Sequence, residues 1–162
     1  CFILIEYSSK EEEIPMRGSD YMMGTQSLRA MTAEHLMERD VAYFKKEAKC
    51  ETLVWAMVEG NFGTAPIVNE EGRLIGAVNE SDLLSAVASG IDLADVSAGE
   101  MMKSVLSISV DKPAMEICRF FRDNPVNRAP VVDGHFHVVG VISRRDILSG
   151  YLEEKMGPPN AF

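Results

Sequence analysis

The sequence lacks the features that mark several large protein classes. It has 3 cysteines in 162 residues, an odd number without a C-x-x-C spacing, which argues against a disulfide framework or a zinc finger. Its apolar runs are shorter than the roughly 18 to 20 residues that cross a bilayer. With 16 basic and 25 acidic residues the net charge is −9, which opposes a nucleic-acid surface. We expect a soluble, cytoplasmic protein with reduced thiols and no signal peptide.

Signatures of catalysis and of metal binding are also scarce. There is no P-loop or G-x-G-x-x-G pattern, so nucleotide hydrolysis and dinucleotide redox chemistry are not indicated. No Ser, Cys or Lys nucleophile has a base marked by the sequence. His135 and His137 follow Asp133 at a chelating spacing, but two histidines beside a turn are more typical of exposed strand residues. We predict that the chain is not an enzyme and holds no metal.

What the sequence does contain is a repeat at an offset of 64 residues. Residues 62–84, FGTAPIVNEEGRLIGAVNESDLL, align without a gap with residues 126–148, VNRAPVVDGHFHVVGVISRRDIL. Ala, Pro, Val, Gly, Asp and Leu coincide, and most other apolar positions stay apolar. Such self-similarity indicates one supersecondary unit used twice, in which each copy covers the apolar face of the other.

Each copy has the pattern strand, helix, strand, strand, helix. Helical apolar spacing occurs in residues 50–59 and 113–122, with Pro113 in a first turn, and an apolar strand segment precedes each helix, at 41–44 and 105–110. Two apolar runs and an amphipathic helix with a capping residue follow in each copy. We divide the chain into a tail or linker at 1–31, repeats at 32–94 and 95–157, and a C-terminal tail at 158–162.

Three elements that occur twice in the same order carry a family resemblance. They are M-x-x-x-apolar (MERDV, MKSVLSI), a small-Pro-apolar-apolar-Asn/Asp turn (APIVN, APVVD) and Gly-apolar-apolar-x-x-x-Asp (GAVNESD, GVISRRD). Both copies resemble cystathionine-β-synthase (CBS) domains, and the pair resembles a tandem CBS, or Bateman, module. The resemblance implies an α+β fold with two β-α-β-β-α repeats packed as a pseudo-twofold pair around two clefts. Such modules bind adenosine-containing ligands and regulate an attached or partner protein.

We call residues 76–82 the first motif and residues 140–146 the second motif. The second motif offers a carboxylate, a hydroxyl beside free backbone N–H groups and two guanidinium groups at a helix start, a set that suits ribose and phosphate. The resemblance assigns ribose binding to the Asp and base recognition to residues 104–108, where the backbone reads the edge of the adenine and the Val105 and Ile108 side chains pack on its face. The predicted ligand-binding residues are Ser104, Val105, Ile108, Arg128, Ser143, Arg144, Arg145 and Asp146. The alternative is that Asp146 only caps its helix and that the arginines form a solvated face.

The first motif is the weaker candidate, with Asn79 and Asp82 as its site residues. Residues 62–84 carry one basic residue against four acidic ones, a net charge of −3, whereas residues 126–148 carry three against two, a net charge of +1. An anionic phosphate should therefore prefer the second copy. Asn79 stands where Ser or Thr is usual in the family, and Glu80 and Ser81 replace the arginines.

The predicted function is a regulatory module that senses AMP, ADP, ATP or S-adenosylmethionine and needs no obligatory cofactor. The resemblance implies a homodimer formed through the apolar helices 50–59 and 113–122, and a regulated protein partner is also expected. Two alternatives remain open at this point: a structural adaptor with empty clefts, and the regulatory fragment of a larger enzyme or transporter.

Overall fold

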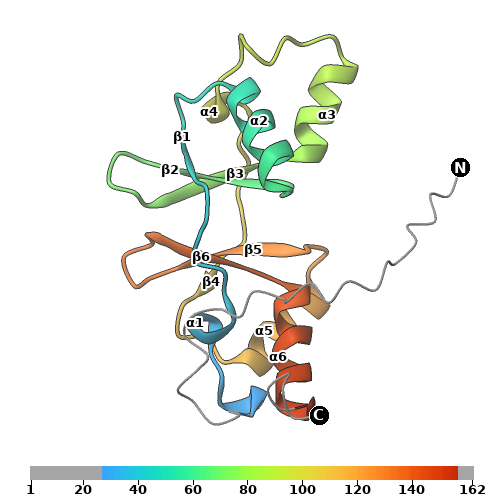
Figure 1. Ribbon diagram of the computed structural model, residues 1–162. Helices are drawn as coiled ribbons and strands as arrows, with labels where there is room; N and C mark the ends of the chain where they lie inside the picture. Colours follow the sequence, from blue (N-terminus) through green and yellow to red (C-terminus); the bar gives the residue numbers. More distant parts are fainter. Residues whose placement is uncertain (1–26, 157–162) are drawn as a thin grey trace, which may run out of the picture.

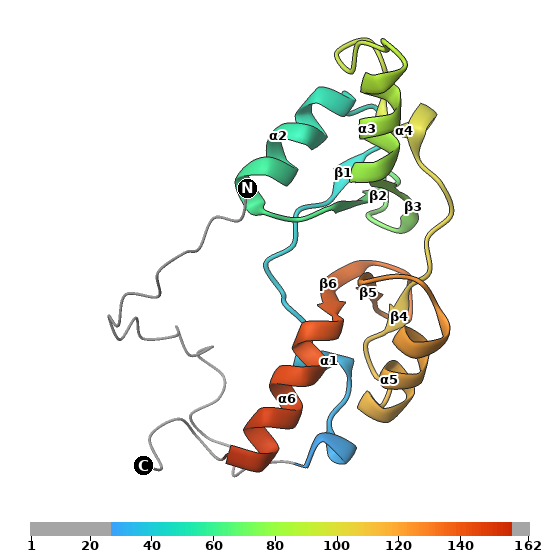
Figure 2. The same ribbon diagram turned by 90° about the vertical axis from the view of Figure 1, so that its right-hand side faces the viewer.

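Two three-stranded sheets stand one above the other in the computed structural model, which describes residues 27–156, with the longer helices on the outer side of each sheet (Figure 1). The view turned by 90° shows the same layering from the side (Figure 2). The predicted mixed α+β class and the paired repeats are confirmed. No helix among the described residues has both the length and the apolar character needed to cross a bilayer.

The two halves contain the same elements at the predicted offset. The first half consists of β1 (Phe44–Lys45), α2 (Cys50–Gly60), β2 (Thr64–Val68), β3 (Leu74–Asn79) and α3 (Glu80–Ala88). The second half consists of β4 (Ile108–Ser109), α5 (Ala114–Asp123), β5 (Arg128–Val132), β6 (Val138–Ser143) and α6 (Arg144–Met156). Three short elements complete the described chain: η2 (Leu28–Ala30), α1 (Ala33–Leu36) and α4 (Ala98–Met101).

Both sheets have the same topology. β1 pairs with β2 in parallel and β2 with β3 antiparallel, and β4, β5 and β6 repeat this arrangement. Residues 65–68 and 129–132 are buried at every position, as expected for strands covered on both faces. Two local predictions were wrong: the first strand of each half has two residues instead of four or six, and Pro113 is the N-cap of α5 instead of a residue of its first turn.

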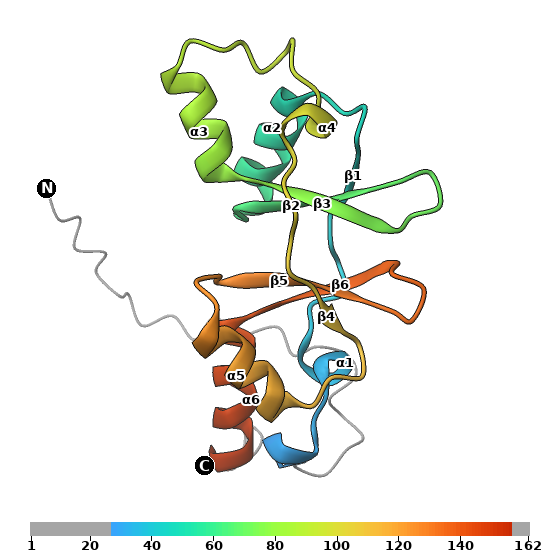
Figure 3. The same ribbon diagram turned by 180° about the vertical axis from the view of Figure 1, so that it is seen from behind.

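The first strands are short because the chain crosses between the halves just before them (Figure 3). We call residues 38–43 and 103–107 the crossing segments. The first crossing segment begins beside β6, where Glu38 pairs with Val141, and leads into β1. The second begins beside β3, where Lys103 pairs with Ala77, and leads into β4. Each crossing segment therefore starts at the sheet of one half and ends in the sheet of the other.

The short helices are exchanged between the halves in the same way. α1 contributes Ala33 and Leu36 to the core of the second half, where they pack with Ile117. α4 contributes Ala98 to the core of the first half, which includes Leu53. Each hydrophobic core is therefore completed by a helix that lies on the far side of a crossing segment.

The glycine that opens each motif is explained by this crossing. A Cβ atom on Gly140 would lie 2.8 Å from the carbonyl oxygen of Glu38 and 2.5 Å from the sulfur of Met37. A Cβ atom on Gly76 would lie 2.8 Å from the carbonyl oxygen of Lys103. Since real Cβ atoms do not approach backbone oxygens so closely, only glycine lets the crossing segment pair with the strand.

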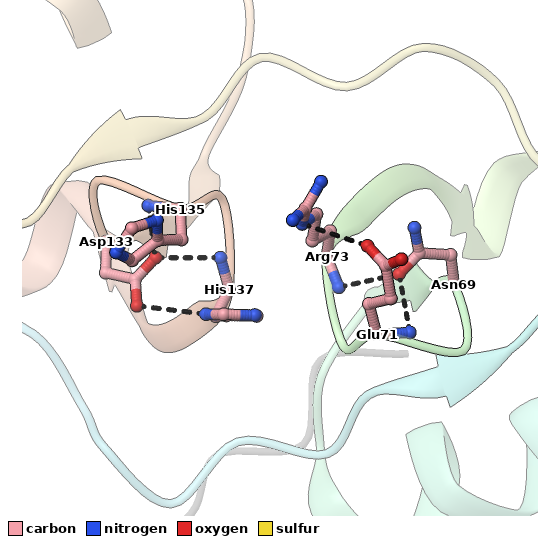
Figure 4. Close-up of polar contacts among 6 residues, drawn as sticks. All are labelled: Asn69, Glu71, Arg73, Asp133, His135 and His137. Atoms are coloured by element: carbon pink, nitrogen blue, oxygen red, sulfur yellow. Dashed lines mark hydrogen bonds and ion pairs between the residues drawn. The ribbon is translucent and has the colours of Figure 1, made fainter.

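The two halves also meet at their hairpin turns, which face each other in Figure 4. The backbone N–H of Leu74 donates to the carbonyl of Phe136 at 2.9 Å, and Arg73 pairs with His137 in an antiparallel bridge. These backbone contacts join the β2–β3 turn of the first half to the β5–β6 turn of the second.

Candidate functional site

The second motif lies where β6 ends and α6 begins. Ser143, the last residue of β6, is 8% exposed, and its hydroxyl and backbone N–H both donate to the Oδ2 atom of Asp146 at 2.7 Å. The N–H of Asp146 in turn donates to the Ser143 hydroxyl at 3.3 Å. This reciprocal pair matches a capping arrangement, so the capping role considered for Asp146 is present in the structure.

The backbone N–H groups at this helix start are less available than the sequence suggests. We expected free N–H groups beside Ser143, but the N–H of Arg144 donates to the carbonyl of Asn127 at 3.1 Å. The N–H of Asp146 is used by the Ser143 hydroxyl, as described above. A ligand phosphate at this end of α6 would therefore depend more on side chains than on the helix N-terminus.

The arginines of the second half lie on different sides of this site. Arg128 on β5 is directly opposite Ser143 on β6, which makes the two side chains neighbours on one face of the sheet. The Arg144 guanidinium instead donates to the carbonyls of Phe121 and Asn124, at 3.1 and 3.2 Å. It therefore caps the end of α5 on the outer helical layer.

The remaining predicted residues divide into exposed and buried positions. Arg145 is exposed at the start of α6. Ser104 is exposed and Val105 is half-buried, but both directly follow Lys103, which pairs with Ala77 on β3, so the predicted grouping of these two residues with the second motif does not fit this structure. Ile108 is fully buried and packs in the core with Ile117. The prediction that the Ile108 side chain packs on a base does not fit this structure, because that side chain points into the core.

The first motif has the same backbone but different partners. Asn79 accepts a hydrogen bond from the hydroxyl of Thr64 at 3.0 Å. Asp82 has a partner that Asp146 does not share at its own motif: its Oδ1 atom accepts a hydrogen bond from the Nζ of Lys103 at 2.5 Å in an ion pair. The Asp82 side chain is 16% exposed and that of Lys103 is 68% exposed.

Lys103 is a site residue that the repeat comparison missed. It lies outside residues 62–84, and it reaches Asp82 only because the second crossing segment runs beside β3. The signal was available in the aligned methionines: Met37 and Met102 precede Glu38 and Lys103, which pair with equivalent strands. The crossing segments therefore add a positive charge beside the first motif and a negative charge beside the second.

The described histidines and cysteines do not gather into a site. The His137 ring lies 3.2 Å from a carboxylate oxygen of Asp133, and within the described residues no three or more His, Cys, Asp or Glu side chains gather as a metal site. Cys50 is fully buried, and this burial raises the pKa of its thiol, which keeps it protonated and unreactive. Cys118 is half-buried, and Cys1 lies outside the described residues.

Two solved structures illustrate the likeness in fold. The CBS domain pair of protein MJ0100, in complex with 5-methylthioadenosine and S-adenosyl-L-methionine, superposes with a TM-score of 0.65 and 21% identity, covering 74% of this chain and 94% of that chain. CBSX2 in complex with AMP superposes with a TM-score of 0.68 and 20% identity, covering 76% and 98%. At these identities the comparisons show the fold alone.

Sequence relatives point the same way. An uncharacterized protein, MK0525, from Methanopyrus kandleri is 27% identical over 123 residues, which is 75% of this chain and 63% of that protein. The chain thus spans less than two thirds of this curated relative. The family model for the CBS domain matches twice, at residues 33–89 and 93–153. Because these two matches cover most of the sequence and coincide with the two structural halves, the chain belongs to the CBS domain family.

Proposed function

We propose that this chain is a regulatory module that binds an adenosine-containing ligand at its second motif. The observation that carries the proposal is the convergence of Ser143, Asp146 and Arg128, which the register of β5 and β6 and the start of α6 bring together. A carboxylate accepts hydrogen bonds from two ribose hydroxyls, and a hydroxyl beside a guanidinium suits a phosphate. A ribose phosphate presents both groups.

The proposed roles follow from the placement of each side chain. Asp146 accepts the ribose hydroxyls, and Ser143 and the arginines Arg128 and Arg145 hold a phosphate. Residues 104–105 are not assigned to the base of this ligand, because Lys103, which directly precedes them, pairs with β3 beside the first motif. Arg144 is not assigned to the phosphate because its guanidinium is held at the end of α5. Ile108 is not assigned to the base because it is buried in the core.

The ligand class is drawn from what related modules bind. The ligands of the MJ0100 pair and of CBSX2 are AMP, S-adenosyl-L-methionine and 5-methylthioadenosine, and their shared part is the adenosine moiety. A site that contacts the ribose and the base would bind all of them. The contacts to phosphate would then determine the relative affinities of the different nucleotides. We propose a reversible regulatory ligand, no obligatory cofactor and no catalysis.

This function is tested by titrating purified protein with AMP, ADP, ATP, S-adenosylmethionine and NAD. Calorimetry measures the binding, and thermal unfolding measures the gain in stability. A ligand at a hundred times its Kd should stabilise the folded protein by about 2.7 kcal/mol. Asp146→Asn should remove most of this gain, because the neutral amide replaces one ribose acceptor with a donor.

Asp82→Asn, the same change at the equivalent position of the first half, is the matched control and should keep the gain. If no ligand shifts the unfolding temperature of folded, nucleotide-free protein, the chain acts instead as a structural adaptor. Equal losses in both variants would move the site away from the second motif.

We also propose that the module self-associates through its outer helices. Large apolar side chains are strongly exposed there, with Trp55 and Val58 on α2, Leu84 on α3 and Leu148 on α6 each more than 60% exposed. Apolar patches of this kind on outer helices are typical of protein interfaces. The chain covers only part of the length of its relatives. We propose that ligand binding changes the conformation of the module and that this change is transmitted to a partner or to an attached protein.

A further inference from the structure

The ion pair at the first motif is anchored by backbone contacts on both sides. Lys103 and Ala77 exchange two backbone hydrogen bonds of 3.0 Å each, which fix the start of the crossing segment beside β3. From this position the Lys103 ammonium reaches the Asp82 carboxylate at 2.5 Å. Because Asp82 lies in the first turn of α3 and is well shielded from solvent, its charge has a defined partner within the fold.

The same backbone position in the second half carries the opposite charge. Glu38 and Val141 exchange two backbone hydrogen bonds of 2.9 Å each, as Lys103 and Ala77 do in the first half. Glu38 is an exposed carboxylate, so the first crossing segment brings a negative charge beside the second motif. The two motifs therefore differ in which charge the crossing segment supplies.

Other positions of the first motif also oppose a nucleotide. Glu80 occupies the position of Arg144, and its carboxylate lies against Gly63, where a Cβ atom would come within 2.7 Å of it. Thr64 stands in place of Arg128 and donates its hydroxyl to Asn79. A phosphate at the first motif would therefore lack the arginine that β5 supplies at the second motif, in a half with more negative charge.

We propose that Lys103 is an internal counter-ion that closes the first motif to adenosine ligands, so that the module binds one equivalent. This inference rests on the proposed function of the second motif. A ribose that bonds to both carboxylate oxygens would have to displace the ammonium from Oδ1 of Asp82, exchanging a charge-assisted hydrogen bond for a neutral one and leaving the lysine without its partner. The lysine thus occupies one of the two acceptor oxygens that a ribose diol needs.

Calorimetric titration with adenosine tests the proposal, because adenosine carries the ribose and the base but no phosphate. The parent should bind one equivalent, and Lys103→Met, which keeps an aliphatic stem but removes the ammonium, should bind two. Adding Asp82→Asn to Lys103→Met should return the stoichiometry to one equivalent. Lys45→Met removes another exposed ion pair of the first half, the 2.8 Å pair with Glu70, and should leave one equivalent.

The outcomes separate this inference from the function on which it rests. One equivalent in both the parent and Lys103→Met would overturn the counter-ion role and leave binding at the second motif intact. Two equivalents in the parent would also overturn it. If the parent binds no adenosine, the proposed function of the second motif is wrong. In that case the counter-ion role survives only if Lys103→Met binds one equivalent. Lys103→Gln, a polar replacement, repeats the test should the methionine variant fold poorly.

Discussion

Asp82 and Asp146 occupy equivalent positions in the two halves and have different partners. Asp146 bonds to Ser143 in its own helix start, whereas Asp82 bonds to a lysine 21 residues further along the chain. The strands, turns and helices around them superpose in register at an offset of 64 residues. The difference therefore comes from the crossing segments, which shows that two motifs with the same backbone can be set apart by a residue outside both.

The largest effect is expected from replacing the glycine that lets a crossing segment pair with a strand, a feature that both halves share. Gly140→Ala would place a methyl group against the carbonyl of Glu38 and the sulfur of Met37, which should destabilise the protein by about 1 to 3 kcal/mol through overpacking. Urea unfolding measures this loss. Gly134→Ala is the matched control because no atom lies within 4 Å of its Cβ position, and a similar loss in both variants would contradict the crowding explanation.

A charge reversal in the first crossing segment should make the second motif behave like the first. Glu38→Lys places an ammonium at the position that Lys103 occupies beside Asp82, so it should weaken adenosine binding about tenfold, or roughly 1.4 kcal/mol. Calorimetric titration measures the change. Asp40→Lys makes the same change in net charge nearby and should have little effect, and equal weakening in both variants would point to a general effect of charge.

The smallest effect concerns the hairpin turns, which differ in the side chain that accepts the backbone hydrogen bonds of the turn. Asp133 accepts backbone N–H bonds from His135 and His137, and Asn69 accepts equivalent bonds from Glu71 and Arg73 (Figure 4). The backbone hydrogen bond from His137 is the main cause that lowers the pKa of Asp133. A lowered carboxyl pKa stabilises the folded state above the unfolded pKa, and this contribution is lost as the pH falls through the folded pKa.

Asp133→Asn should therefore remove part of the acid sensitivity of unfolding while keeping the turn that Asn69 already forms in the first half. Urea midpoints of the parent and the variant, measured at neutral pH and at acid pH, test this. The gap between the two proteins should shrink or reverse at acid pH. A gap independent of pH would show that the Asp133 charge does not contribute to stability.

Much of the fold could be predicted from the sequence because the repeat fixes it locally. Apolar periodicity and the Pro, Gly and Asp positions predicted β2, β3, α3 and their equivalents, since these depend on neighbours close in sequence. The short first strands were not predicted, because apolar residues such as Val41 and Val105 also occur where a chain crosses between two packed layers. The pattern alone does not distinguish these two settings.

The candidate site could be predicted only in part, for a related reason. Ser143, Asp146 and Arg128 come together through strand register, which the alignment of the repeats implies. The direction of the Arg144 side chain depends on where α5 ends, and the Lys103 contact depends on how the crossing segment packs. A count of charges within one sequence window leaves out residues that fold onto it from elsewhere.

The exchange of the short helices has a consequence for how the molecule can be divided. A chain cut at residue 94 would leave α1 in one piece and most of the core that it covers in the other, and α4 would be separated from its core in the same way. Neither piece would hold a complete hydrophobic core. The two repeats are separable as sequence units, but we expect them to fold as a single cooperative unit.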